Sequence, residues 1–288
     1  MRQIKDRQKA RLEWRGRSRP AGQVTRGKTA HNRLRRVDLY LLLAERYLVG
    51  RGDGLFANGL FVDVGYGAEP FTTLESAARL RTVNPGLPVL GVEIEPERVA
   101  AALPYADTQT HFRLGGFNVP LFPGEQARII RAFNVLRQYE ESVVTGAWQL
   151  MGQSLLPGGL LIEGTSDPFG RVWAANLLRK QAGGELLAEG LLFSCNLRHG
   201  FHPEQLQPVL PKNYIHRMVP GEPIAAFFHQ WQQAYRETLP YRQWGARPHF
   251  VQAAQRLADM GVKVDLRPRL LTRGFLWISF AGMEKYLF

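Results

Sequence analysis

Apolar residues in the first half of the chain form short continuous runs that alternate with stretches of helical periodicity. The runs typical of buried strands lie at 60–67, 89–94, 110–115, 127–134 and 160–164. The segments with helical spacing lie at 37–49, 71–81, 96–103 and 139–156. Continuous apolar strands that alternate with helices are typical of a parallel sheet covered on both faces. This half therefore predicts a doubly wound α/β domain.

The alternation stops after about residue 165 and returns near residue 246. A strand is expected at 191–197, within a stretch that is otherwise Pro-rich and then helical. The pattern after it predicts a helix at 248–261 and two strands, 262–271 and 274–280, that pair antiparallel. We predict a seven-stranded, mostly parallel sheet with an antiparallel last strand.

Three parts of the chain are expected from this pattern. The core domain comprises 37–164 plus 246–288, and residues 165–245 are an insertion before the last helix and strands that covers a substrate site. The remaining part, residues 1–36, is a basic N-terminal arm.

Positive charge is concentrated in this arm. The chain carries a formal net charge of +12, and residues 1–36 hold 13 of its 37 Lys and Arg residues with only two acids. The rest of the chain is nearly neutral. Such arms often bind nucleic acid through its phosphates, which predicts a nucleic-acid partner, RNA more than DNA. A solvated tail, or contact with an acidic partner, is the alternative.

The arm contains "GQVTRGKT" at 22–29, which matches the phosphate-binding pattern G-x-x-x-x-G-K-[ST]. That pattern binds phosphate only between a buried strand and a helix. The preceding residues, "LEWRGRSRPA", hold three arginines and a proline and no apolar run. We therefore interpret Lys28 as one more cation of the arm, and a nucleotide hydrolase as a weak alternative.

Composition excludes several classes of protein. The single cysteine, Cys195, permits no internal disulfide, and with no cysteine cluster and no metal-type histidine spacing we expect no metal site. A reducing, cytoplasmic compartment is the simplest interpretation. The sequence contains no run of 18 consecutive apolar residues, so we expect no membrane-spanning helix. The oligomeric state is left open.

The most informative stretch is "FVDVGYGAEP" at 61–70, where a predicted strand ends in a glycine turn. Ligands of doubly wound sheets bind at such turns. A dinucleotide site needs a third glycine, but Pro70 stands there, and Asp63 would repel a pyrophosphate. Glu93, at the end of the next strand, is placed to accept hydrogen bonds from ribose hydroxyls. These features favour a nucleoside with a cationic or amino-acid tail.

S-adenosylmethionine fits that description, and the chain resembles the class I S-adenosylmethionine-dependent methyltransferase superfamily. The first motif of that family, an acid, any residue, Gly, any residue and Gly, stands here at 63–68, and its second is the acid that closes the next strand, Glu93. The resemblance covers roughly 60–164 and the predicted hairpin at 262–280. It implies S-adenosyl-L-methionine as cofactor, bound by Asp63, Gly65, Tyr66, Gly67, Ala68, Glu93, Ile94, Gly116, Phe117 and Asn134. Ile94 is expected against the adenine, and Phe117 is a candidate for stacking on it or for the core.

The segment after the fourth strand, "NVLRQYEE", departs from the family pattern. It lies at the lip nearest the methyl group, so Asn134 is expected to orient the acceptor, and Arg137 and Tyr139 to contact it. Helix capping and packing are the alternative for Arg137 and Tyr139. Methyl transfer needs little beyond alignment, because the sulfonium is already activated.

Three functions follow from these features. The first is a methyltransferase acting on RNA, with the arm holding phosphates. The second is a methyltransferase for a small molecule or a protein, with the arm serving another purpose. The third is a nucleic-acid-binding protein whose cofactor site is not catalytic, which the unusual lip motivates.

Overall fold

The apolar runs form one nine-stranded sheet, in a computed structural model that describes residues 19–286. Its order is β3-β2-β1-β4-β5-β6-β7-β9-β8. The strands are β1 (Leu60–Val64), β2 (Val89–Glu93), β3 (Thr110–Leu114), β4 (Ala127–Phe133), β5 (Leu155–Ser166), β6 (Val172–Lys180), β7 (Leu186–Cys195), β8 (Lys263–Val264) and β9 (Phe275–Ser279).

The first five strands confirm the predicted parallel half of the sheet. β1 pairs with β2 and β4, β2 with β3, and β4 with β5, and every one of these pairs is parallel. The chain moves outward from β1 to β3 and then crosses back to β4, so the winding reverses between β1 and β4. In open parallel sheets, ligands bind at the carboxyl ends of the strands beside such a reversal.

The other half of the sheet corrects the prediction of seven strands. β6, β7, β9 and β8 all pair antiparallel, and β6 and β7 come from residues 165–245, so this segment extends the sheet. The predicted strand at 262–271 is only two residues long. The chain then forms the short helix α10 (Pro268–Leu271), because Pro268 has no N–H for a strand ladder but suits the first turn of a helix.

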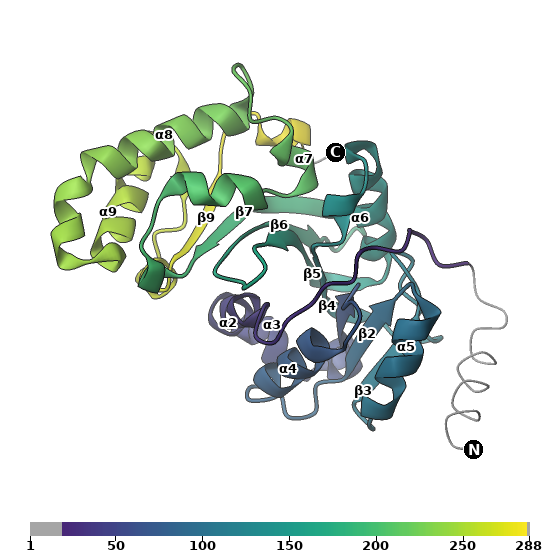
Figure 1. The fold of residues 1–288 in the computed structure, drawn as a ribbon. Coiled ribbons are helices and arrows are strands. Elements are labelled where there is room, and N and C mark those ends of the chain that lie inside the picture. The colour runs from purple at the N-terminus through teal and green to yellow at the C-terminus, as the bar shows by residue number, and fades with distance from the viewer. Residues whose placement is uncertain (1–18, 287–288) are drawn as a thin grey trace.

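Helices cover both faces of the sheet (Figure 1). They are α2 (Arg35–Ala44), α3 (Arg46–Gly50), α4 (Phe71–Leu80), α5 (Pro96–Ala102), α6 (Val144–Gln153), α7 (Lys212–Ile215), α8 (Pro223–Glu237) and α9 (Ala246–Asp259), besides α10. The predicted helix at 139–156 is shorter, because a 3₁₀ turn at Glu141–Val143 precedes α6 and β5 begins at Leu155. Within the described residues, no helix is long and apolar enough to cross a membrane.

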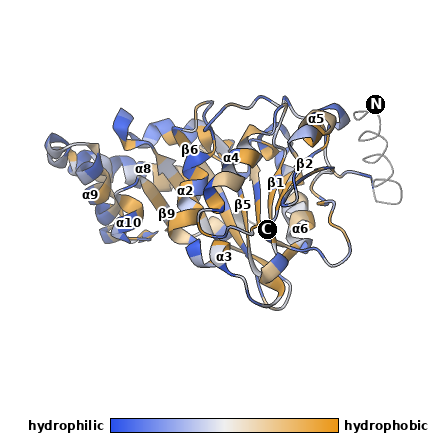
Figure 2. Ribbon diagram, turned by 90° about the horizontal axis from the view of Figure 1, so that it is seen from below, coloured by the Kyte–Doolittle hydropathy of each residue, from blue (hydrophilic) through white to orange (hydrophobic). Residues whose placement is uncertain are grey.

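The core has two main parts, one on each side of the sheet. Neighbouring strand residues alternate between them: Val62 packs in the cluster that contains Trp148 of α6, and Phe61 packs in the cluster that contains Leu41 of α2. Strands buried on both faces read as continuous apolar runs, which is why their positions could be predicted. In Figure 2 the central strands are largely orange, whereas the helices carry both colours.

The predicted basic arm divides at the edge of the described residues. Residues 1–18, which hold most of its cations, lie outside them. Residues 19–34 do not extend away from the domain: in Figure 1 this dark purple segment runs across the sheet toward α2. It has no strand or helix until α2, so the glycine-lysine-threonine match at 22–29 lacks the strand and helix that a phosphate-binding loop requires.

One carboxyl group lies inside the larger core cluster. Glu163 of β5 is 1% exposed and accepts a hydrogen bond from Nδ2 of Asn176 of β6 at 2.9 Å. Burial raises the pKa of Glu163 to about 7, and the hydrogen bond from Asn176 opposes this shift. The folded protein therefore holds a proton on Glu163 at pH values where the unfolded chain has lost it.

We expect Glu163→Gln to remove a pH dependence of stability. A folded-state pKa above the unfolded value makes wild-type stability fall from about pH 4.5 to pH 7. The variant should gain on the order of 2 kcal/mol over the wild type between pH 5 and pH 8. Urea unfolding of both proteins across this range measures the difference. Parallel pH profiles would show that Glu163 does not titrate as described.

Candidate functional site

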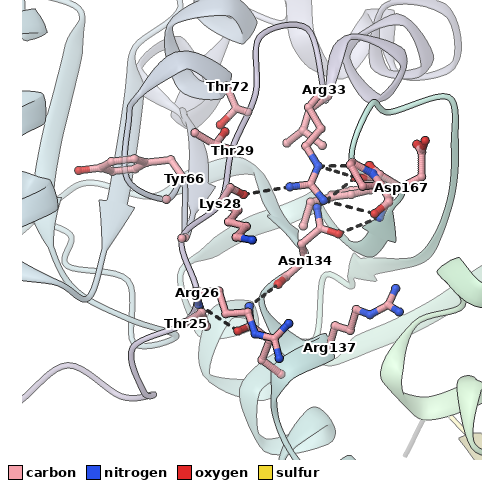
Figure 3. Close-up of a pocket in the computed structure, with 18 of the residues that line it drawn as sticks. Thr25, Arg26, Lys28, Thr29, Arg33, Tyr66, Thr72, Asn134, Arg137 and Asp167 are labelled. Atoms are coloured by element: carbon pink, nitrogen blue, oxygen red, sulfur yellow. Dashed lines mark hydrogen bonds between the residues drawn. The ribbon is translucent and has the colours of Figure 1, made fainter.

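A cavity of about 700 Å³ opens at the winding reversal, beside the carboxyl ends of β1 and β4. Six stretches of the chain line it: 25–29, 33–34, 63–72, 133–138, 166–168 and 208–209. Figure 3 shows the side chains that surround it. The cavity lies where the sequence predicted a ligand site, with residues 25–34 as an unexpected wall.

The turn after β1 requires glycine at both predicted positions. Gly65 and Gly67 have φ angles of +72° and +94°, a region that other residues rarely adopt. A Cβ atom at Gly65 would lie 2.5 Å from Cγ2 of Val135, and one at Gly67 would lie 2.7 Å from the carbonyl oxygen of Gly27. The turn is therefore closely packed against both the lip and the N-terminal segment.

Asp63, before this turn, is neutralised inside the protein. Its carboxylate is 2.8 Å from the guanidinium of Arg131, which is fully buried. The hydroxyls of Thr72 and Thr73 donate to the same carboxylate at 3.0 and 2.8 Å. Arg131 also contacts Asp38 of α2 at 2.8 Å. Burial acts to lower the pKa of Arg131, but the two carboxylates hold it above its ordinary value.

Glu93, at the end of β2, joins two loops. Its carboxylate is 1% exposed and accepts hydrogen bonds from the backbone N–H groups of Gly67 at 3.0 Å and Ile94 at 2.9 Å. The guanidinium of Arg98 lies 3.5 Å away. The two acids predicted from sequence thus sit beside one glycine turn, and each already has partners within the chain.

The residues predicted beside adenine are covered by the chain itself. Residues 19–26, which we call the strap, cross Ile94, Gly116 and Phe117. The carbonyl oxygen of Ala21 accepts a hydrogen bond from the N–H of Phe117 at 2.9 Å. A Cβ atom at Gly116 would lie 2.0 Å from that same oxygen. The strap backbone therefore lies directly on this surface.

Tyr139, a predicted acceptor contact, instead holds the strap. Its hydroxyl donates to the carbonyl of Gln23 at 3.0 Å and accepts from the N–H of Gln23 at 2.7 Å. Burial raises the pKa of Tyr139, which keeps this hydroxyl protonated as a donor. The aromatic ring packs on Phe117 at 5.2 Å. Only about 20 Å³ of space remains between the strap and this surface.

Asn118 secures the beginning of the strap. Its side chain accepts a hydrogen bond from the N–H of Ala21 at 2.8 Å and donates to the carbonyl of Arg19 at 3.0 Å. Near the other end of the strap, Gln138 accepts from the N–H of Arg26 at 3.0 Å.

The residues after the strap are attached independently of it. The N–H of Ala68 donates to the carbonyl of Gly27 at 2.8 Å. The guanidinium of Arg33 donates to the carbonyl of Lys28 at 2.9 Å and to the hydroxyl of Ser166 at 3.1 Å. Leu34 is buried in the core cluster that contains α2. Residues 27–34 are therefore fixed to the domain whether or not the strap stays in place.

The other two predicted catalytic residues do line the cavity. Asn134 has a φ of +62°, and its amide oxygen accepts from the N–H of Ser166 at 2.9 Å while its Nδ2 donates to the Ser166 hydroxyl at 3.1 Å. Arg137 donates to the carbonyl of Pro208 at 2.8 Å. Asn134 thereby joins the ends of β4 and β5, and Arg137 links the lip to residues 208–209.

Several lining residues were not singled out from the sequence. They are Thr25, Arg26, Thr29, Arg33, Thr72, Ser166, Pro208 and Val209. Lys28 was interpreted only as a cation of the arm, although it lines the cavity. The approach of 25–29 to the glycine turn is a long-range contact for which the sequence carries no periodic signal.

Potential metal ligands do not cluster in the described residues, and the single thiol is buried. Among residues 19–286, no three His, Cys, Asp or Glu side chains lie together as a metal site needs. Cys195 is buried, and burial raises the pKa of its thiol to about 12, which is unsuited to a nucleophile at neutral pH.

Comparison with known proteins identifies similar structures only. No protein family matches the sequence, and no curated protein is significantly similar to it. The structure of LepI in complex with S-adenosylmethionine matches at 17% identity over 43% of this chain and 30% of LepI, with a TM-score of 0.33. The N-methyltransferase NodS from Bradyrhizobium japonicum WM9 matches at 16% identity over 46% of this chain and 67% of NodS, with a TM-score of 0.31. Human N-acetylserotonin methyltransferase in complex with SAM matches at 19% identity over 46% and 37%, with a TM-score of 0.30.

These likenesses extend to part of the fold and carry no information about the reaction. This chain spans less than a third of LepI. The parallel order β3-β2-β1-β4-β5, with the glycine turn after β1 and the acid that closes β2, agrees with the fold that the resemblance to class I methyltransferases predicts for this half of the sheet. The residues assigned to cofactor and acceptor stay predictions.

We expect Arg131→Met to lower the free energy of unfolding by about 3–5 kcal/mol, because it leaves the buried Asp63 carboxylate uncompensated. Urea denaturation measures this loss. The triple variant Arg131→Met, Asp38→Asn, Asp63→Asn should recover part of it, since no unpaired buried charge remains. If the single and triple variants lose the same free energy of unfolding, the packing of Arg131 and not the neutralisation of its charge stabilises the protein here, which would contradict this interpretation.

Proposed function

We propose that the protein is an S-adenosylmethionine-dependent methyltransferase. The observation that carries the proposal is the hydrogen bond from the N–H of Gly67 to Glu93, which brings the two predicted cofactor motifs together at the winding reversal. Gly65, Tyr66 and Gly67 line the cavity and would hold the methionyl part, whereas the N–H of Ala68 bonds to Gly27. Glu93 would accept from the ribose.

The fit of the cofactor differs between the two halves of the crevice. The half beside the glycine turn opens into the 700 Å³ cavity. The half beside Ile94, Gly116 and Phe117 retains about 20 Å³ under the strap, far too little for an adenine ring. The adenosyl group therefore fits only after the strap leaves this surface. In the structure the N–H of Phe117 donates to the carbonyl of Ala21. When the strap leaves, this N–H would be free to bond to the base.

Bound S-adenosylmethionine would supply an activated methyl group to an acceptor in the cavity. The task of the chain is then alignment of the acceptor with that group. Asn134 and Arg137 line the cavity and are the residues we assign to this positioning. The bonds from Asn134 to Ser166 fix its side chain, which favours an orienting role over proton transfer.

Gly22→Val should tighten S-adenosylmethionine binding. Gly22 has a φ of +131°, and a Cβ atom there would lie 2.9 Å from the hydroxyl of Tyr139, so a branched side chain cannot occupy the strap position. Only molecules whose strap has left the site can bind the cofactor, so apparent affinity rises as the open fraction rises. We expect Kd to decrease about two- to fivefold by titration calorimetry, because a strap of marginal net stability already leaves part of the wild-type population open.

The matched control is Gly52→Val, because a Cβ atom at Gly52 meets nothing within 4 Å. Its cofactor affinity should equal that of the wild type. Two results would contradict the proposal: no binding of S-adenosylmethionine to any of the three proteins, or equal affinity of the Gly22 variant and the wild type.

For the acceptor we propose RNA, supported by the concentration of cations in residues 1–36. An enclosed small-molecule acceptor is the second candidate, supported by the cover that Pro208 and Val209 give the cavity. The third candidate is a different function: a nucleic-acid-binding protein that holds the cofactor without transferring its methyl group.

Transfer of labelled methyl groups from S-adenosylmethionine into total RNA tests the first candidate. Gly65→Arg should abolish the transfer, since a side chain there collides with Val135. Label found only in small molecules or in protein would remove RNA as the acceptor. Cofactor binding without transfer to any pool would favour the non-catalytic function.

A further inference from the structure

Four cationic side chains line the cavity: Arg26, Lys28, Arg33 and Arg137. They come from two separate regions of the chain, the N-terminal segment and the lip after β4. Figure 3 shows them arranged around Asn134. Arg26, Lys28 and Arg137 are exposed and Arg33 is half-buried, so these charges are open to solvent as well as to the cavity.

The protein compensates these cations only in part. Within residues 19–286, none of the four forms an ion pair with a carboxylate. Arg33 and Arg137 donate to uncharged oxygen atoms, as described above. Burial lowers the pKa of Arg33, nearby Asp167 raises it, and Arg137 adds to the lowering, so the two arginines repel each other across the cavity.

The two acids of the cavity do not balance this charge. Asp63 is neutralised by Arg131. One carboxylate oxygen of Asp167 accepts from the backbone N–H groups of Arg171 and Val172 at 2.6 and 3.2 Å, so this residue caps the turn after β5, and its charge offsets only one of the four cations. The cavity is therefore positive, and an anionic ligand in it would offset the charge of a sulfonium bound beside it.

We propose that the cavity binds a phosphate group of the methyl acceptor, held chiefly between Lys28 and Arg137. A phosphate offers acceptor oxygens in several directions, which suits cations on opposite walls better than a single planar carboxylate does. Lys28 acts as a point charge, and Arg137 supplies a fork of N–H donors. That the phosphate belongs to a methyl acceptor rests on the proposed function, but phosphate binding itself can be tested without methyl transfer.

The phosphate has two possible sources, a free phosphomonoester and the backbone of RNA. Binding of inorganic phosphate, of each ribonucleoside 5′-monophosphate against its nucleoside, and of a short single-stranded RNA is measured by calorimetry. The test variant is Lys28→Gln with Arg137→Gln. The control is Arg46→Gln with Arg247→Gln, which removes two exposed arginines that do not line the cavity.

The phosphate probes should bind the test variant at least about tenfold more weakly than the wild type, because each charged hydrogen bond lost is worth about one power of ten or more. The control variant should change binding less than about threefold. Saturable binding of a monophosphate but not of its nucleoside would assign the site to a small molecule. Selective loss with RNA alone would assign it to a nucleic-acid backbone.

Equal losses in the two variants would overturn the proposal, since the charges would then act as a general field. A loss of S-adenosylmethionine affinity in the test variant, with phosphate binding unchanged, would also overturn it, because the cations would serve the cofactor carboxylate. Equal melting temperatures of the variants confirm that folding is intact. If S-adenosylmethionine fails to bind even with Gly22→Val while the phosphate results hold, the proposed function fails and the phosphate site remains.

Discussion

The buried contact of Arg131 with Asp63 and Asp38 is the constraint on which the geometry of this site depends. It ties together β4, β1 and α2, and Ser76 of α4 accepts a further bond from the same guanidinium at 2.7 Å. All of these groups lie beneath the winding reversal. A buried charge network of this kind permits few alternative arrangements, because any shift leaves a charge without a partner at a cost of several kcal/mol. The glycine turn and the lip are thus held at fixed positions on either side of the cavity.

The same contact changes the meaning of Asp63. From the sequence, its carboxylate was a candidate for attracting a cationic ligand. In the structure its charge faces Arg131, so its contribution to the cavity potential is small. The partner was hidden within the apolar run of β4, "ARIIRAF", where an arginine in a buried strand gives no sign of which carboxylate it meets.

Sequence reasoning succeeded where local pattern determines structure. The five parallel strands, the positive-φ glycines and the acid at the end of β2 each have a signal within a few residues. It failed where contacts are distant along the chain. The strap follows no periodicity, and its bonds to Asn118 and Tyr139 join residues 97 and 116 positions apart. β6 was missed because "VWAANLLRK" is apolar on both sides of the strand and reads equally well as a buried helix.

The strap and the segment that follows it are held with very different strength. Eight hydrogen bonds hold residues 19–26 to the domain, each worth about 1 kcal/mol net. Ordering eight residues of backbone costs about 1–2 kcal/mol per residue, so these bonds barely offset it. The one branched apolar side chain of the strap, Val24, is 53% exposed and adds little burial.

Residues 27–34 are held by more than such bonds, since Leu34 is buried in the core and Arg33 bonds to the end of β5. The strap is therefore separable from the surface it covers, whereas Lys28 and Arg33 stay at the cavity when it leaves. An opened strap would join the covered half of the crevice to a cavity whose positive charge is already in place. A cationic cofactor and an anionic acceptor in that joined space would each strengthen the binding of the other, since the anion offsets the repulsion between the cofactor and the cavity cations, and the cofactor adds a positive charge that attracts the anion.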